Sequence, residues 1–178
     1  MIAHVGLSPL KGTHVLLKAL ALLKKKGVKF TALLIRKTGP KTYRQYLERM
    51  IETLDLKDYI KMLGFVSPID LLHVYNAADV IVVPSYSEGS PLIISESLAC
   101  RTPVIATDVG GNAEYLGPVG LNSLLLKTSF YDISNSSSEK IYNVREIEHI
   151  RIKTLSNRDY ILSWEQVAEK HIDVIKHG

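Results

Sequence analysis

Short apolar runs alternate with longer amphipathic segments along the first two thirds of the chain. The apolar runs are rich in Val, Ile and Leu and are bounded by Gly, Pro or polar residues, which is typical of strands buried on both faces of a sheet. They predict strands at 2–7, 29–36, 59–65, 80–83, 104–106 and 122–126. Because helical segments separate these runs, the pattern favours an α/β fold: a doubly wound, Rossmann-like parallel sheet of about six strands with helices on both faces.

Three of the predicted helices start at a proline that follows a predicted strand. Proline has no amide hydrogen to lose at the first helical position, and a preceding serine caps the free backbone amides. Asp70 stands three residues after Ser67, where its side chain reaches back to the cap. The three starts are Gly39–Pro40, Ser67–Pro68 and Ser90–Pro91. The predicted helices accordingly cover 13–26, 40–54, a segment from 68 onwards, and 91 to about 100.

The composition is that of one ordinary domain. The chain has 178 residues, of which 46% are hydrophobic and 22% charged, enough to bury one core. We expect the core at about 1–128. After it comes a polar stretch and then a helical segment at about 137–177, in which Trp164 is expected to anchor the packing.

Charge and hydropathy narrow the possible partners. The net charge of +4 modestly favours anionic ligands such as nucleotide diphosphates, or an anionic membrane surface, although a basic surface without a specific partner fits equally well. The lysines at 24–26 complement the end of a helix dipole, so they call for no nucleic acid. There is no bilayer-spanning run, no signal-peptide pattern and a single cysteine, Cys100. These features favour the cytoplasm, with peripheral contact to the inner face of the membrane as an option.

Two carboxylates frame the helix predicted after Ser90–Pro91. Glu88 lies in the loop before this helix, and Glu96 lies on its second turn. Ligands of open α/β sheets bind outside the carboxyl ends of the strands, and a helix start there offers free amides to a phosphate. A carboxylate beside a phosphate needs hydroxyl groups as partners, and sugar hydroxyls meet that need. We therefore expect both glutamates to face one cleft.

The stretch SEGSPLIISESLACRTPVIATDVGG resembles the signature of the retaining GT-B glycosyltransferases of family 4. The match includes two glutamates with seven residues between them, a Gly-x-Pro step after the first, the PVIA strand and the Gly110–Gly111 turn. With lower specificity, HVGLSPLKGTHVLLKALALL resembles the first strand, the Lys-Gly loop and the first helix of the same family. The resemblance implies that the chain is one half of a GT-B fold.

The resemblance also implies a role for each site residue. Glu96 would hold the ribose hydroxyls of a nucleotide sugar, and Glu88 would meet the donor hexose as the catalytic carboxylate. Lys11 would contact the diphosphate, and the loop at Phe65 and Val66 would flank the nucleobase, although Phe65 is more often a core aromatic residue. The backbone that would bind donor sugar and diphosphate comprises Gly89, Ser90, Pro91, Leu92 and Ile93.

Two positions depart from the family pattern. The family usually carries an arginine after the glycine that ends the first strand, whereas Leu7 follows Gly6 here. The family also continues its second strand into a Gly-x-Gly-Pro turn, of which IRKTGP keeps only the last two residues. Arg36 or Lys37 would be the nearest substitutes for the missing positive charge.

The function implied is that of a donor domain. It would bind a nucleoside diphosphate sugar, as part of a retaining glycosyltransferase that moves a hexose to an acceptor. The N-terminal acceptor domain, which ordinarily precedes Ile2, would come from elsewhere or from a separate chain, so the isolated chain is expected to be inactive. The nucleotide sugar is a substrate, and no other cofactor is expected.

Several alternatives remain. The first is a non-catalytic nucleotide-sugar-binding module, or an accessory subunit, and the second is half of a sugar-nucleotide epimerase or phosphorylase. Without the motif, two exposed structural glutamates would be the default, and a glycoside-hydrolase acid and base pair is less suited to a helix start beside a phosphate. The histidines and the cysteine show no metal-ligand spacing and there is no Asp-x-Asp triplet, so no metal is expected.

Overall fold

The computed structural model describes residues 1–35, 40–117 and 125–126 of the chain. These residues form an alternating series of strands and helices. In chain order the elements are β1 (Ile2–Val5), α1 (Thr13–Lys25), β2 (Ala32–Ile35), α2 (Lys41–Thr53), β3 (Ile60–Leu63), α3 (Pro68–Ala77), β4 (Val80–Val83), α4 (Leu92–Ala99), β5 (Val104–Thr107), α5 (Asn112–Leu116) and β6 (Leu125–Leu126).

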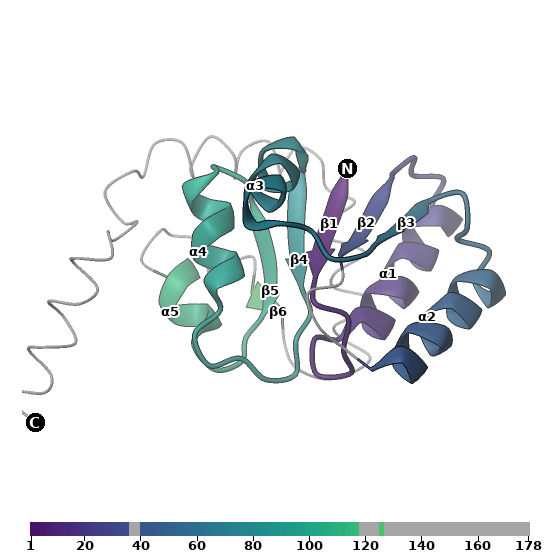
Figure 1. Cartoon of the computed structure of the whole chain (residues 1–178), viewed down its shortest axis with the longest axis horizontal. Coiled ribbons are helices and arrows are strands. Elements are labelled where there is room, and N and C mark those ends of the chain that lie inside the picture. The colour runs from purple at the N-terminus through teal and green to yellow at the C-terminus, as the bar shows by residue number, and fades with distance from the viewer. Residues whose placement is uncertain (36–39, 118–124, 127–178) are drawn as a thin grey trace, which may run out of the picture.

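The strands form one six-stranded sheet in the order β3-β2-β1-β4-β5-β6, and every neighbouring pair is parallel. This confirms the predicted fold class. The helices α1 and α2 lie together toward one end of the molecule, and α3, α4 and α5 gather toward the other (Figure 1). From β1 the chain moves outward to β3 and then returns to β4 on the other side of β1. The boundary between β1 and β4 is therefore the topological switch point, where ligands of such sheets bind.

The element boundaries differ from the predicted ones mainly at the strand ends. β1, β2 and β3 have four residues each, so they are shorter than the apolar runs 2–7, 29–36 and 59–65, of which residue 36 lies outside the described residues. Helix α5 was not predicted, since five residues are too few to show helical periodicity. The predicted strand at 122–126 appears as β6, and its first three residues and the helical segment 137–177 lie outside the described residues.

The proline-based helix starts were only partly right. Ser67 caps α3 as predicted: its hydroxyl oxygen accepts from the amide of Asp70 at 3.2 Å and donates to the Asp70 carboxylate at 2.6 Å. The prediction of Ser90 as a cap with Pro91 inside the helix is wrong, because α4 begins at Leu92 and Pro91 occupies the cap position. The Ser90 hydroxyl bonds instead to the hydroxyl of Tyr115, at 2.7 Å.

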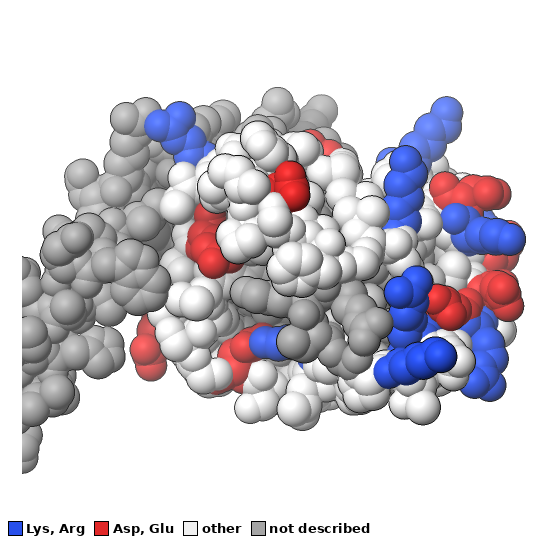
Figure 2. Space-filling view, in the orientation of Figure 1, with Lys and Arg blue, Asp and Glu red and all other residues white. Residues whose placement is uncertain are grey.

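Charged side chains on the viewed face are mixed in sign. Lys and Arg gather over the α1 and α2 end, where Asp and Glu lie among them (Figure 2). Lys24 pairs with Asp55, and Arg44 pairs with Glu48 at 2.9 Å. In the part of the chain that the structure covers, no helix is long and apolar enough to cross a membrane.

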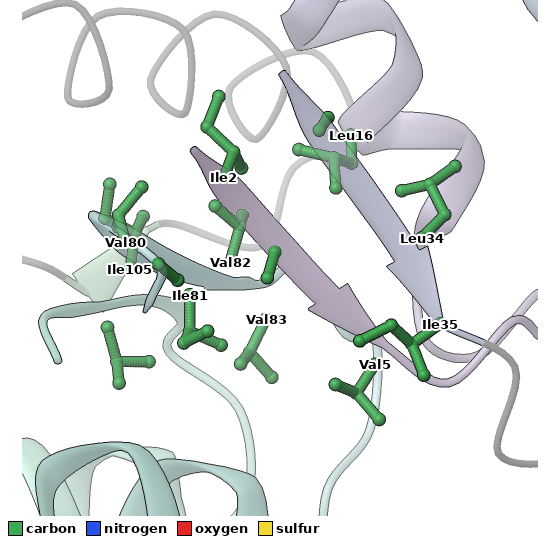
Figure 3. Packing of buried hydrophobic residues seen from close by; sticks show 14 of the residues in the cluster. Ile2, Val5, Leu16, Leu34, Ile35, Val80, Ile81, Val82, Val83 and Ile105 are labelled. Carbon is green, nitrogen blue, oxygen red and sulfur yellow. The ribbon is translucent and has the colours of Figure 1, made fainter. Parts of the chain in front are cut away.

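The core lies between the sheet and its helices. All four residues of β1 and of β4 are buried, as expected for strands at the centre of a parallel sheet. Val5 and Ile35 are paired in register, and they lie side by side where β1 and β2 end (Figure 3). These two side chains carry the core up to the carboxyl edge of the sheet, where the predicted site residues stand.

Candidate functional site

The loops that follow β1 and β4 meet at the topological switch point. The amide of Tyr86 donates to the carbonyl oxygen of Leu10 at 2.8 Å, which ties loop 84–91 to loop 6–12. Gly12 has φ 67°, and a Cβ atom there would lie 1.9 Å from the carbonyl oxygen of Pro84. Only glycine allows the two backbones to approach this closely.

A third loop, 108–111, closes on the same place from the carboxyl end of β5. Gly110 has φ 51°, and a Cβ atom there would lie 1.7 Å from the carbonyl oxygen of Glu88. A Cβ atom at Gly111 would lie 2.5 Å from the carbonyl oxygen of Gly89. The double-glycine turn of the predicted motif thus holds the backbone of Glu88 and Gly89. We call these three packed loops the loop junction.

Lys11 and Glu88 form an ion pair within the loop junction. The Lys11 Nζ atom lies 2.8 Å from both carboxylate oxygens of Glu88. The Glu88 side chain is only 6% exposed, whereas that of Lys11 is 38% exposed. Ser85 donates its hydroxyl to Glu88 Oε1 at 2.6 Å, so the buried carboxylate has both a cation and a neutral donor. The structure thereby brings together two residues that are 77 positions apart in sequence.

Two buried polar side chains, those of Thr107 and His4, hydrogen-bond to backbone carbonyl oxygens in or next to the loop junction. Thr107 donates its hydroxyl to the carbonyl oxygen of Ser85 at 2.5 Å. His4 lies between the carbonyl oxygen of Val82 and the hydroxyl of Thr13, with 2.9 Å to each. Burial lowers the pKa of His4 to about 4, an effect only partly opposed by its backbone hydrogen bonds. The ring is therefore neutral at pH 7; it donates to the carbonyl through Nδ1 and accepts through Nε2.

Beside the loop junction lies a pocket of about 320 Å³. Val5 and Ile35 line it from the strand ends, and Phe65 and Val66 line it from the loop after β3. One face of α3, at i, i+3, i+4 and i+7, supplies Pro68, Leu71, Leu72 and Tyr75, and α4 supplies Glu96. We call this the apolar pocket, because Tyr75 and Glu96 are the only polar residues among the described ones that line it.

The two polar side chains of the apolar pocket are bonded to each other. The Tyr75 hydroxyl donates to Glu96 Oε2 at 2.7 Å. Burial, together with this hydrogen bond to a carboxylate, raises the pKa of Tyr75 far above its usual value of 10. Tyr75 is therefore a protonated donor at every physiological pH.

The backbone predicted to bind the donor lies at the start of α4. The amide of Leu92 donates to the carbonyl oxygen of Ser90 at 3.0 Å, and that of Ile94 donates to the carbonyl oxygen of Pro91 at 2.9 Å. Gly89 faces open space, since no atom outside its chain neighbours lies within 4 Å of where a Cβ would stand. Gly89, Ser90 and Pro91 therefore precede α4, whereas Leu92 and Ile93 are its first two residues.

The predicted site residues fall into two groups. Glu96, Phe65 and Val66 line the apolar pocket, whereas Glu88 is not among the residues that line it and instead meets Lys11 in the loop junction. The expectation that both glutamates face one cleft stays a prediction. Phe65 is 79% exposed, so the core alternative is wrong for that residue.

The remaining predictions concern charge and metals. Leu7 is buried and brings no polar group to the site, and Arg36 and Lys37 lie outside the described residues. Among residues 1–35, 40–117 and 125–126, no group of three or more His, Cys, Asp or Glu side chains is placed to hold a metal ion.

Sequence reasoning missed Tyr75 and Ser85. The signal for Tyr75 was present: it shares a helical face with Pro68, Leu71 and Leu72, although nothing local indicated that this face opens onto a pocket. Ser85 carried no such signal, because its role depends on how a short loop folds back onto Glu88.

The family described as "Glycosyl transferases group 1" matches residues 2–141. The chain belongs to this family. Among its curated relatives are D-inositol 3-phosphate glycosyltransferases. The one from Mycolicibacterium vanbaalenii is 39% identical over 119 residues, covering 62% of this chain and 26% of the relative. The one from Corynebacterium glutamicum is 37% identical over 115 residues, covering 62% of this chain and 28% of the relative. The chain thus spans about a quarter of the length of these relatives.

Solved structures share the fold over most of this chain. Anabaena HepE in complex with UDP and glucose has a TM-score of 0.78 at 24% identity, and the likeness covers 99% of this chain and 48% of that chain. The C-terminal domain of a glycosyl transferase group 1 family protein from Francisella tularensis has a TM-score of 0.71 at 22% identity. That likeness covers 86% of this chain and 81% of the Francisella domain.

Proposed function

We propose that this chain is the donor domain of a retaining family 4 glycosyltransferase, which binds a nucleoside diphosphate hexose. An acceptor-binding domain, or a separate acceptor-binding chain, would complete the enzyme that transfers the hexose. Three findings support the proposal: membership of the glycosyl transferases group 1 family, the curated relatives named as glycosyltransferases, and the likeness in fold to a C-terminal domain of the same family.

The observation that carries the proposal is the placement of two different environments side by side at the switch point. The apolar pocket suits a flat nucleobase, because its walls are apolar and Phe65 stands exposed at its edge. Glu96 lies in the same pocket, where its carboxylate would accept hydrogen bonds from the two ribose hydroxyls.

The loop junction would provide the charged side chains that contact the diphosphate and the hexose of the donor. Lys11 would meet the diphosphate, and the backbone of 89–93 would bind phosphate and sugar. Glu88, held beside Lys11, would accept from hydroxyls of the hexose and act as the catalytic carboxylate. Because Lys11 already pairs with Glu88, a diphosphate would have to share this cation with the carboxylate. The proposal includes no metal ion and no cofactor other than the donor substrate.

The test is a calorimetric titration of the purified chain with UDP-, GDP- and ADP-sugars, alongside the Glu96→Ala variant. Selective binding that is lost in the variant would establish a donor domain and name its nucleotide. Unchanged affinity in Glu96→Ala would contradict the assignment of Glu96 to the ribose. If none of the three sugars binds to the wild-type chain, the donor-domain proposal fails for the isolated chain.

A further inference from the structure

The hydroxyl of Tyr75 is the one donor among the described side chains that line the apolar pocket. It lies 2.7 Å from Glu96 Oε2, and the two residues come from different helices that pack together, α3 and α4. A carboxylate has two oxygens and about four acceptor positions. A bond to Oε2 therefore leaves Oε1 and one position on Oε2 open to a ligand.

Tyr75 is itself held firmly in place. Its ring is buried and its backbone carbonyl oxygen accepts from the buried hydroxyl of Thr102 at 2.6 Å. A buried aromatic side chain has few rotamers, so its hydroxyl is a fixed point against which the Glu96 side chain, with three rotatable bonds, is oriented. Packing alone does not require this hydroxyl, because phenylalanine would fill nearly the same space.

We propose that Tyr75 is a positioning residue for nucleotide binding: its hydroxyl fixes the Glu96 carboxylate so that the remaining acceptor positions meet the two ribose hydroxyls. The inference rests on the proposed function, since it assumes that the ligand is a ribonucleotide. Tyr75 would act on the ligand through Glu96, so both α3 and α4 would contribute a residue to recognition of the ribose. Preorganisation of this kind gives affinity, because less side-chain entropy is lost on binding.

A merely structural role for the hydroxyl would predict something different. If the Tyr75–Glu96 bond served only to join α3 to α4, its loss would lower stability and would weaken all ligands alike. A positioning role predicts a loss confined to ligands that carry ribose hydroxyls. The discriminating quantity is therefore the ratio of affinities for a ribonucleotide and its deoxy analogue.

The experiment compares the wild-type chain with Tyr75→Phe by calorimetry, using UDP, GDP and ADP and their 2′-deoxy and 3′-deoxy forms. For the nucleotide that binds, Tyr75→Phe is expected to weaken the ribonucleotide roughly threefold to tenfold, the range of one hydrogen bond. The deoxy analogues should change much less, so that the preference for ribose shrinks by a similar factor.

Two further variants keep the result interpretable. Tyr59→Phe is the matched control, because Tyr59 lies at the amino end of β3, away from the carboxyl edge of the sheet, and packs against Phe30. It should leave both affinities unchanged. In the Glu96→Ala background, Tyr75→Phe should have no further effect on the preference for ribose, since the group that it positions is gone.

The outcomes separate this inference from the function on which it rests. If the wild-type chain binds a nucleotide and Glu96→Ala loses the preference for ribose, but Tyr75→Phe keeps it, the positioning role is overturned and the donor domain stands. An equal loss for ribonucleotides and deoxynucleotides in Tyr75→Phe, with a lowered melting temperature, overturns it in favour of a structural bond. If the wild-type chain binds none of the probes, the proposed function and the inference fail together.

Discussion

At Gly12, Gly110 and Gly111 of the loop junction, backbone packs against backbone with no room for an added carbon atom. The apolar pocket beside the junction, in contrast, is open and lined by side chains. Glu88 is buried in the first region and Phe65 is exposed in the second. The two regions share the carboxyl edge of the same sheet. Their difference indicates that the junction is part of what holds the fold together, while the pocket rim is not. Substitutions in the junction should therefore act first on stability, and those at the rim should act first on binding.

The strongest way to break the junction is Gly110→Ala. Its backbone is left-handed, and the new Cβ atom would overlap the carbonyl oxygen of Glu88. Left-handed strain of roughly 1–2 kcal/mol and forced displacement of a packed loop together predict a loss of about 3 kcal/mol or more in the free energy of unfolding. Urea denaturation of the purified variant measures this loss.

Gly27→Ala is the matched control for that substitution. Gly27 also has a positive φ, of 74°, but nothing lies within 4 Å of its added Cβ atom. It should cost only the backbone strain, about 1 kcal/mol. Equal losses in the free energy of unfolding for the two variants would show that the close approach at Gly110 does not contribute to stability. The loop junction would then not differ from an open turn in this respect.

Acid should destabilise the fold through His4, beneath the junction. The pKa of His4 is about 4 in the folded chain and near 6.5 when unfolded, so between these values the unfolded chain binds more protons and stability falls as the pH falls. The full effect, reached near pH 4, is about 3 kcal/mol, and at pH 7 it is absent. Unfolding free energies measured from pH 7 to pH 4 should show a drop that is smaller in His4→Gln.

Loss of an exposed histidine should not reproduce this change. His73 is exposed on α3, so His73→Gln controls for the loss of a histidine far from the junction. An equal fall in stability on acidification for wild type and His4→Gln would assign the acid sensitivity to carboxylates elsewhere. That result would contradict the assignment of the acid sensitivity to a buried, neutral His4.

Lys11→Ala tests the ion pair of the junction and should have an intermediate effect. It leaves the buried Glu88 carboxylate with Ser85 but without its cation, which predicts a loss of about 1–2 kcal/mol in stability, reduced because Lys11 is partly exposed. Diphosphate affinity should also fall, and the deficit should shrink as salt is added. Arg44→Ala breaks an exposed pair and should change stability by less than about 0.5 kcal/mol. Similar effects in both variants would mean that the burial of Glu88 gives the pair no special weight.

The fold was predictable because its signals are local and repeated. Each buried strand is an apolar run, and the alternation with helices favours a parallel sheet whatever the loops do. The cap at Ser67 was predictable for the same reason, since its partner Asp70 is three residues away. The cap at Ser90 was not, because its hydroxyl bonds to Tyr115, which lies 25 residues later on a helix that the sequence did not indicate.

The candidate site could also be predicted only in part, because partners that are distant in sequence could not be identified. The motif named Glu88 and Glu96 as candidates, but the partner of each carboxylate comes from a distant segment. Lys11 lies 77 positions from Glu88, and Tyr75 lies 21 positions from Glu96. Glycines at 12 and 110 were visible in the sequence, yet the atoms that make them necessary belong to another loop. Pairings of this kind depend on tertiary packing, which a single sequence does not record.

Phe65→Ala, at the rim of the apolar pocket, should have the smallest effect on stability of these variants and a clear effect on binding. Phe65 is exposed, so its truncation should change the unfolding free energy by less than about 0.5 kcal/mol. If its ring lies against the nucleobase, nucleotide affinity should fall by about 1 kcal/mol, or roughly fivefold. Ile69→Ala, also exposed but not among the residues that line the pocket, should change neither quantity. Calorimetric titration and thermal unfolding of the three proteins decide the matter: lost stability with unchanged affinity in Phe65→Ala would make the rim structural, and the separation of the two regions would be wrong.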